Sequence, residues 1–280
     1  MPASDLLADV APEVGVAKPD PVLVADGVVR RYGGLTAVDV EHLEVPRGVI
    51  TALIGPNGAG KTTFFNLLCG FDKADAGSWT FEGSPAQGVR PHVLARRGMV
   101  RTFQLTKTLG RMTVLDNMLL AARDQAGEGL LRALVPPTWR AEERANTERA
   151  HDLLTRFKLD KLADGYAAGL SGGQRKLLEM ARALMADPTL VMLDEPMAGV
   201  NPALTKSLLG HVTALRDDGM SVLFVEHDMD VIMTISDWVV CMAEGRVIAE
   251  GRPADIAGNP AVIEAYLGID HGGQTSGTIR

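Results

Sequence analysis

Eight consecutive residues, GPNGAGKT at 55–62, have the types and spacing of a phosphate-binding loop. They fit the pattern G-x-x-x-x-G-K-[S/T] in full. Glycines let the backbone curl so that successive N–H groups can point at phosphate oxygens. We expect Lys61 to reach the terminal phosphates of a nucleotide and the Thr62 hydroxyl to bind Mg²⁺. The residues expected to bind the nucleotide here are Gly55, Pro56, Asn57, Gly58, Ala59, Gly60, Lys61, Thr62 and Thr63.

Two adjacent carboxylates follow a second apolar run, TLVMLD at 189–194. A nucleotide site of this kind needs a carboxylate at the end of a neighbouring strand to anchor the metal. Successive residues of a strand point to opposite faces, so we predict different roles for the two side chains. Asp194 would hold the metal. Glu195 would act as general base toward the attacking water, or orient it, a contribution of about 10²–10⁴ in rate.

A second glycine-containing turn, LSGGQ at 170–174, opens a helix far from the first loop and has no lysine of its own. The N-terminus of a helix attracts anions because its N–H groups and dipole favour negative charge. The turn taken alone is equally typical of an ordinary capped helix. Its residues Ser171, Gly172, Gly173 and Gln174 are therefore candidates for a second contact with phosphate.

The elements that must position these residues alternate between strand and helix. Continuous apolar runs, as at 49–54 and 221–225, predict strands buried on both faces. Apolar residues recur at helical spacing between these runs. The first part of the chain, 21–81, is β-rich, and the middle, about 111–162, reads as helical. The pattern predicts an α/β fold in which helices cover a parallel sheet and a helical insertion interrupts the order.

Composition narrows the class of protein. The chain has 280 residues, 46% hydrophobic, with a formal net charge of −7, which argues against a general nucleic-acid binder. The sequence has no apolar run of about 18–20 residues and no signal peptide, so we expect a cytosolic protein. Cys69 and Cys241 read as isolated buried thiols. We expect flexible tails at 1–20 and 269–280.

With these motifs in this order, residues 21–268 resemble the ATPase subunits of ABC transporters, and LSGGQ is the signature of that superfamily. The resemblance implies a P-loop NTPase with a RecA-like parallel-sheet core, an N-terminal antiparallel β subdomain and a helical subdomain at about 105–185. It also implies that two ATPase domains dimerise head to tail. Each ATP would lie between the phosphate loop of one domain and the signature turn of the other.

The resemblance also implies roles for single residues. Tyr32 in RRYGG would stack on adenine, and His227 after SVLFVE would contact the γ-phosphate. Gln104 in RTFQ would reach Mg²⁺ and the attacking water and link the site to the helical insertion. Many ABC ATPases have Asp in the loop after the catalytic Glu, whereas this chain has Asn201, a form that some importers share. The surface from Phe103 to Met118 is our candidate for docking to permease loops.

Several segments resemble one subgroup, the LivG-like ATPases of branched-chain amino-acid importers. They are RYGGLTAV, GMVRTFQ, the insertion around 125–147, MAGVNP, VEHDMDVIM and NPAVIEAYLG. This implies uptake driven by ATP-dependent dimer closure at the cytoplasmic side of the membrane. The implied partners are a second ATPase subunit (a paralogue or a second copy), two permeases and, indirectly, an external binding protein. The alternatives are a urea or short-chain amide importer, the ATPase of lipopolysaccharide export, and a non-transport ABC ATPase.

Overall fold

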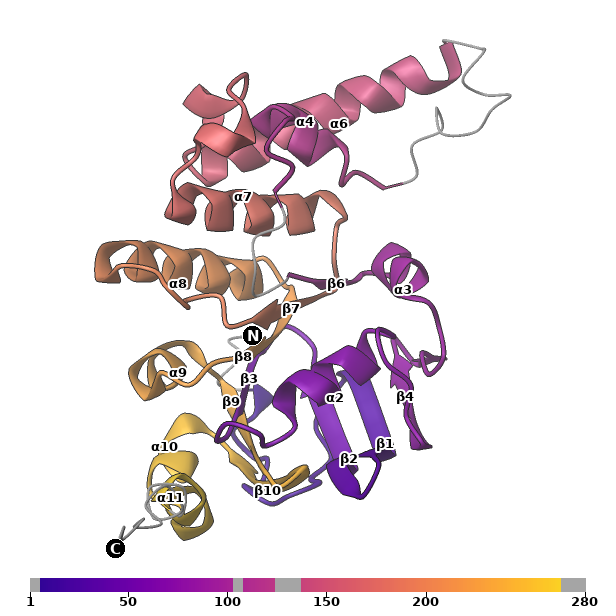
Figure 1. The fold of residues 1–280 in the computed structure, drawn as a ribbon, viewed down its shortest axis with the longest axis vertical. Helices are drawn as coiled ribbons and strands as arrows, with labels where there is room; N and C mark the ends of the chain where they lie inside the picture. The colour runs from indigo at the N-terminus through magenta and orange to yellow at the C-terminus, as the bar shows by residue number, and fades with distance from the viewer. Residues whose placement is uncertain (1–5, 103–107, 124–136, 268–280) are drawn as a thin grey trace, which may run out of the picture.

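A computed structural model describes residues 6–102, 108–123 and 137–267, with side chains from 140 onward in the last range. The N-terminal half contains a four-stranded antiparallel sheet of order β2-β1-β4-β5. Figure 1 shows this sheet packed beside helix α2 at one end of the molecule. Its strands are β1 (Pro21–Tyr32), β2 (Leu35–Pro46), β4 (Ala76–Phe81) and β5 (Ser84–Pro85).

The second sheet has six strands in the order β10-β9-β3-β8-β7-β6. Its strands pair in parallel from β9 to β6, and β10 pairs with β9 in an antiparallel hairpin around Glu244 and Gly245. All residues of β3, β7 and β8 are buried, which confirms the prediction of strands covered on both faces. The strands are β3 (Ile50–Ile54), β6 (Met99–Arg101), β7 (Leu190–Asp194), β8 (Ser221–Val225), β9 (Trp238–Ala243) and β10 (Arg246–Gly251).

Helices cover this sheet and form a separate layer beyond it. Figure 1 shows α4, α6 and α7 stacked together at the end of the molecule opposite the hairpin of β9 and β10. These helices lie between β6 and β7 in the chain, so the predicted α/β core with a helical insertion is confirmed. The helices are α2 (Lys61–Leu68), α3 (Pro91–Arg97), α4 (Val114–Leu119), α6 (Pro137–Arg156), α7 (Gly172–Met185), α8 (Pro202–Asp217), α9 (Met229–Ile235), α10 (Pro253–Ala257) and α11 (Pro260–Leu267).

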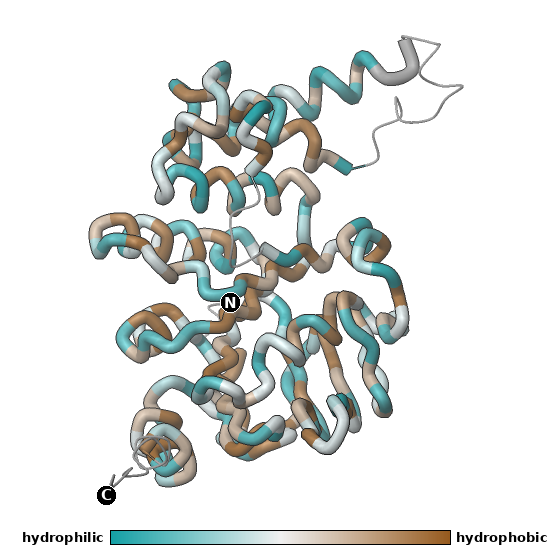
Figure 2. The backbone as a smooth tube through the Cα atoms, in the orientation of Figure 1, coloured by the Kyte–Doolittle hydropathy of each residue, from teal (hydrophilic) through white to brown (hydrophobic). Residues whose placement is uncertain are grey.

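The apolar side chains form two clusters, one on each side of the six-stranded sheet. Within β3, Ile50, Ala52 and Ile54 belong to one cluster and Leu53 to the other, as alternation along a strand requires. Figure 2 shows the hydrophobic stretches concentrated in these central strands. The sheet is therefore packed on both faces, and this packing holds the residues at its strand ends in place.

The first described helix of the insertion, α4, has a capped start. Thr113 caps α4 by accepting a hydrogen bond from the Asp116 amide, and the Asp116 carboxylate accepts one from the Thr113 amide. This reciprocal capping satisfies two N–H groups that have no partner within the helix.

Both cysteines are buried and free, as expected. Within the described ranges, no helix has the length and apolar composition needed to cross a membrane.

The segment after residue 5 differs from the expected flexible tail. Leu7 is 1% exposed, and the ammonium group of Lys18 lies 2.6 Å from a carboxylate oxygen of Glu250, with side chains 0% and 1% exposed. Gly15 donates its amide to the same carboxylate, and so does the Trp238 indole N–H. The prediction of a tail reaching residue 20 overlooked these anchors, because a single lysine in a polar segment does not reveal a buried partner more than 200 residues away.

Lys18→Met is expected to lower the free energy of unfolding by about 3–5 kcal/mol, because it leaves the buried Glu250 carboxylate without its counter-charge. The denaturant midpoint of the full chain would report the loss. Arg252→Met is the matched control: Arg252 pairs with Asp255 at the surface, 3.0 Å away, and such pairs contribute about 0–1 kcal/mol. Equal midpoints for the two variants would contradict the anchoring role of Lys18.

Candidate nucleotide-binding site

The phosphate loop connects the end of β3 to the start of α2, as the sequence predicts. Two of its glycines are required by close backbone contacts. At Gly55, with φ of +141°, an added Cβ would lie 2.0 Å from the Met242 carbonyl oxygen. At Gly60, with φ of +95°, it would lie 2.2 Å from the Ala37 carbonyl oxygen. Larger residues would therefore push the loop away from the hairpin and β2.

The Lys61 side chain reaches back to the first residues of the phosphate loop. Its ammonium group donates to the carbonyl oxygens of Gly55 at 2.5 Å and Pro56 at 2.8 Å. Burial lowers the pKa of Lys61, while the nearby carboxylates of Glu195 and Asp194 act in the opposite direction. The ammonium group is thus held by neutral carbonyls at the strand end, from which it can turn toward an anion.

A pocket of about 700 Å³ opens in front of the loop. Glu195 from the strand end and Glu244 from the hairpin line it together with the loop residues and part of β2. Tyr32 lies in its wall and is 47% exposed. The complete lining is Tyr32, Leu35, Thr36, Ala37, Asn57, Gly58, Ala59, Gly60, Lys61, Thr62, Thr63, Glu195 and Glu244.

The Tyr32 ring is fixed by its neighbours. The Arg30 guanidinium lies 4.5 Å from the ring centroid, and the Tyr32 hydroxyl donates to the Asp72 carboxylate. Asp72 also pairs with Arg30 at 3.0 Å. An aromatic ring held in this way at the wall of a pocket is suited to stack on a planar base.

Asp194 ends β7 and is buried. One of its carboxylate oxygens lies 2.6 Å from the Arg101 guanidinium, which also donates to Asn66 at 2.6 Å. Asp194 and Thr62 supply a carboxylate and a hydroxyl, the hard oxygen donors that Mg²⁺ prefers, and Mg²⁺ commonly binds through one or two carboxylates plus phosphate oxygens. The described residues contain no cluster of three or more His, Cys, Asp or Glu that could hold a metal by themselves. The donor set therefore fits Mg²⁺ bound jointly with a phosphate.

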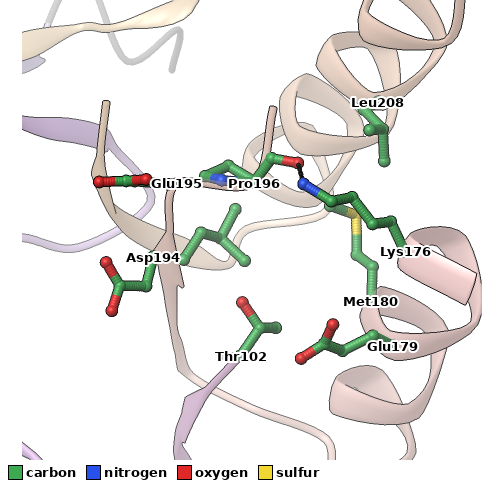
Figure 3. A pocket seen from close by; sticks show the side chains of 9 residues that line it. Thr102, Lys176, Glu179, Met180, Asp194, Glu195, Pro196 and Leu208 are labelled. Carbon is green, nitrogen blue, oxygen red and sulfur yellow. Dashed lines mark hydrogen bonds between the residues drawn. The ribbon is translucent and has the colours of Figure 1, made fainter. Parts of the chain in front are cut away.

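Glu195 departs from the strand geometry on which our prediction of its direction rested. Its φ is +48°, so the extended backbone stops at Asp194 and the rule of alternating faces does not apply to the pair. Figure 3 shows both carboxylates on the side of the strand end away from Lys176. Their contacts nevertheless differ: Asp194 is paired with Arg101, whereas Glu195 lines the large pocket and lies 3.7 Å from Nε2 of His227.

The turn at 170–174 has the geometry of an anion-binding helix start. Ser171 caps α7: its hydroxyl accepts from the Gln174 amide at 3.2 Å, and the Gln174 side chain accepts from the Ser171 amide at 2.9 Å. The Ser171 hydroxyl keeps its proton to donate. A Cβ at Gly173 would lie 1.9 Å from Leu204. Among the described residues lining the pocket at Lys61, none comes from this turn.

Other predicted positions are placed as follows. Asn201 caps α8: its side-chain oxygen accepts a hydrogen bond from the Leu204 amide at 2.9 Å. An Asp at this position would make the same cap. Gln104, with Phe103 at the start of the proposed docking surface, lies outside the described residues. The described part of that surface, 108–118, contains α4 as far as Met118.

Several site contacts were missed by reasoning from sequence. Arg101 on β6 donates to the Asp194 carboxylate. Its position in the RTFQ segment, three residues before Gln104, is the only signal in the sequence that placed it near the site. Tyr266 on α11 accepts a hydrogen bond from the Gly55 amide at 3.0 Å, and burial raises its pKa to about 12. Lys176 on α7 contacts the loop after Glu195. The segment NPAVIEAYLG carries a resemblance to one subgroup, but contacts between residues so far apart in the chain have no local sequence pattern.

Comparisons with known proteins agree with this geometry. A family model for ABC transporters matches residues 38–198, and a model for branched-chain amino acid ATP-binding cassette transporters matches 246–272. The chain is 45% identical over 247 residues to a probable branched-chain amino acid transport ATP-binding protein LivG of Archaeoglobus fulgidus, covering 88% of this chain and 95% of the relative.

A second relative is the high-affinity branched-chain amino acid transport ATP-binding protein BraF of Pseudomonas aeruginosa, with 41% identity, 89% of this chain and 98% of the relative covered. A solved structure of the ADP conformation of an ATP-binding cassette has a TM-score of 0.77 and 37% identity, covering 89% of this chain and 100% of that one. The chain therefore belongs to the ABC transporter family of ATP-binding cassettes and is an ATPase of that family.

Proposed function

We propose that this ATPase powers the uptake of branched-chain amino acids, as the named function of its relatives suggests. The observation that carries the proposal is the match of residues 246–272 to the branched-chain amino acid cassette model, together with relatives of that name over nearly the whole chain. A urea or amide importer, a lipopolysaccharide exporter and a non-transport ATPase are not favoured by these matches.

The proposed reaction follows from the pocket at Lys61. Adenine stacks on Tyr32, and the phosphates lie along the N–H groups from Asn57 to Thr63 at the start of α2. Lys61 turns from its two carbonyl partners to the terminal phosphates, where its charge offsets theirs. Mg²⁺ held by Thr62 and Asp194, with Gln104 as a further ligand, would neutralise charge on the phosphate oxygens.

Glu195 then accepts the proton of the attacking water, and His227, whose ring lies beside it, contacts the γ-phosphate. For Asp194 to hold Mg²⁺, its carboxylate must share or give up its contact with Arg101. Glu195 lines the large pocket beside His227, where its carboxylate can serve the water.

The signature turn completes the site of a second subunit. Ser171 and Gly173 do not line the pocket that contains Lys61 among the described residues, yet they form a helix start with an exposed hydroxyl. A turn of this kind needs no lysine if it meets a phosphate that Lys61 of another subunit already neutralises. We propose a head-to-tail dimer with a paralogue or a second copy, in which Gly172 and Gln174 complete the turn.

The dimer would act at the cytoplasmic side of the membrane as a peripheral assembly. Its partners would be two permease subunits and, through them, an external binding protein; no nucleic acid is involved. Dimer closure would reach the permeases through Gln104 and the surface from Phe103 to Met118. Charge reversals in 108–118 that left transport-coupled hydrolysis intact would contradict this docking surface.

Lys61→Ala is expected to weaken ATP binding by about 10- to 100-fold, the loss of one charge-assisted hydrogen bond to phosphate. Equilibrium binding of a fluorescent ATP analogue to the full chain measures the change. Lys206→Ala serves as the control, since Lys206 is an exposed lysine on α8. Unchanged affinity in Lys61→Ala would exclude the proposed phosphate contact.

Deletion of the gene in its source organism is expected to abolish most high-affinity uptake of leucine, isoleucine and valine. Wild-type protein should restore uptake, and Lys61→Ala protein should not. Uptake of radiolabelled leucine measures the result, with urea uptake as the internal comparison. Normal leucine uptake together with lost urea uptake would contradict branched-chain amino acids as the solute and indicate urea instead. It would not contradict the assignment as an ATPase.

A further inference from the structure

The loop that follows Glu195 is held by a lysine of another element. The Lys176 ammonium group, on the second turn of α7, donates to the carbonyl oxygen of Pro196 at 2.9 Å and to that of Ala198 at 2.5 Å. Figure 3 shows Lys176 reaching from α7 to Pro196, directly beside Glu195. One side chain thus joins the helix that Ser171 caps to the loop directly after Glu195.

The same loop is fixed on its other side by a carboxylate. Glu226 is 2% exposed and accepts a hydrogen bond from the Met197 amide at 2.9 Å. The amide of His227 lies 3.3 Å from its other oxygen. Glu195 itself donates its amide to the Val225 carbonyl at 3.0 Å. The loop is therefore bound by two side chains: Lys176 holds the Pro196 and Ala198 carbonyls, and Glu226 holds the Met197 amide.

This support matters because the backbone at Glu195 is in a conformation that side-chain-bearing residues rarely adopt. Its φ of +48° lies in the left-handed region, which persists when surrounding contacts impose it. The pocket between Lys176 and Glu195 has a volume of about 20 Å³, close to the space for a single water.

The charges around Lys176 favour its position. Burial lowers the pKa of Lys176, and the carboxylates of Glu226, Glu179 and Glu195 counteract that effect. Glu179 follows Lys176 on α7 itself, whereas Glu195 and Glu226 directly follow the ends of β7 and β8. Lys176 is therefore a cation placed between the signature helix and the strand-end carboxylates, which is a suitable place for transmitting a shift of one to the other.

We propose that Lys176 is a positioning residue for Glu195: by holding the Pro196 and Ala198 carbonyls, it fixes the direction of the Glu195 carboxylate. It also ties that carboxylate to the turn at Ser171 of the same chain. Engagement of this turn by ATP bound to the partner subunit would thereby set the geometry of the chain's own hydrolytic site. The inference rests on the role proposed for Glu195.

Lys176→Met is expected to lower kcat for ATP hydrolysis by about 10- to 100-fold, the size of effect that a displacement of about 1 Å produces. The affinity for ATP should change less than about twofold, because no nucleotide contact is removed. Lys176→Arg keeps a charged donor able to bind two carbonyls and should recover most of the rate. Lys161→Met, at an exposed lysine in the same subdomain, is the matched control.

A double-mutant cycle separates positioning from general stability. In a Glu195→Gln background, Lys176→Met should alter the residual single-turnover rate by less than about twofold, because the group it positions is gone. An equal fall in both backgrounds would overturn the inference, as would an unchanged kcat in Lys176→Met alone. If Lys176→Met fails to fold, Lys176→Ala, which also removes the donor to both carbonyls, takes its place in the same cycle.

The two levels of the proposal fail in different ways. Normal hydrolysis by Glu195→Gln would refute the role of Glu195 and with it the inference. Loss of hydrolysis in Glu195→Gln with wild-type rates in Lys176→Met or Lys176→Ala would refute the positioning by Lys176 alone.

Discussion

Glu195→Gln is expected to slow ATP hydrolysis by about 10²–10⁴-fold while leaving ATP binding intact, because Gln cannot accept the proton of the attacking water. The side chains have the same shape, so the contact with the pocket wall and the backbone at φ +48° should persist. With hydrolysis slowed, ATP should accumulate between two subunits and hold them together. Steady-state phosphate release and light scattering of the full chain with ATP and Mg²⁺ measure the two effects.

Glu264→Gln provides the control for this variant, since Glu264 is an exposed carboxylate on α11. It should hydrolyse ATP at the wild-type rate and show no ATP-dependent increase in mass. A Glu195→Gln protein that hydrolyses ATP within threefold of wild type, roughly 0.65 kcal/mol, would assign the general base to another group.

Ser171→Arg is expected to reduce hydrolysis by roughly 10²–10³-fold, comparable to the loss of a transition-state hydrogen-bond donor. The guanidinium would occupy the space into which a phosphate must come at the start of α7, and the exposed hydroxyl would be lost. Each subunit should still bind ATP with wild-type affinity, because Ser171 does not line the described pocket around Lys61. Parallel measurement of kcat and of equilibrium ATP binding tests both statements.

Removal of the Ser171 cap has a cost of its own, about 0.5–2 kcal/mol of helix stability. Ser171→Thr keeps a hydroxyl and a cap and should retain most of the activity. Loss of ATP binding in Ser171→Arg, with normal thermal unfolding, would place the turn in the same site as Lys61 and exclude a contact in trans.

The sequence predicted most of the fold because its signals are local. The phosphate loop lies between a continuous apolar strand and a helix, and Thr113 with Asp116 gives a recognisable helix start. The elements of the α/β core and the helical insertion were found in this way. The burial of Lys18 against Glu250 was not, since the pair is separated by most of the chain.

The site was predictable in its residues but not in its contacts. Lys61, Asp194 and Glu195 were identified from motifs, yet the reversal of φ at Glu195 changes the direction that strand alternation would give it. The Arg101 partner of Asp194 arises from the pairing of β6 with β7, which no spacing in the sequence reveals.

We propose that one ATP is held between the phosphate loop of one subunit and the signature turn of another. The most direct test is a structure of the Glu195→Gln protein, assembled with its ATPase partner where one is required, with ATP and Mg²⁺ bound. We expect Lys61 of one subunit and Ser171 of its neighbour, or the equivalent residues of a paralogue, to contact the same triphosphate. A triphosphate contacted by Lys61 and Ser171 of one and the same chain would contradict it.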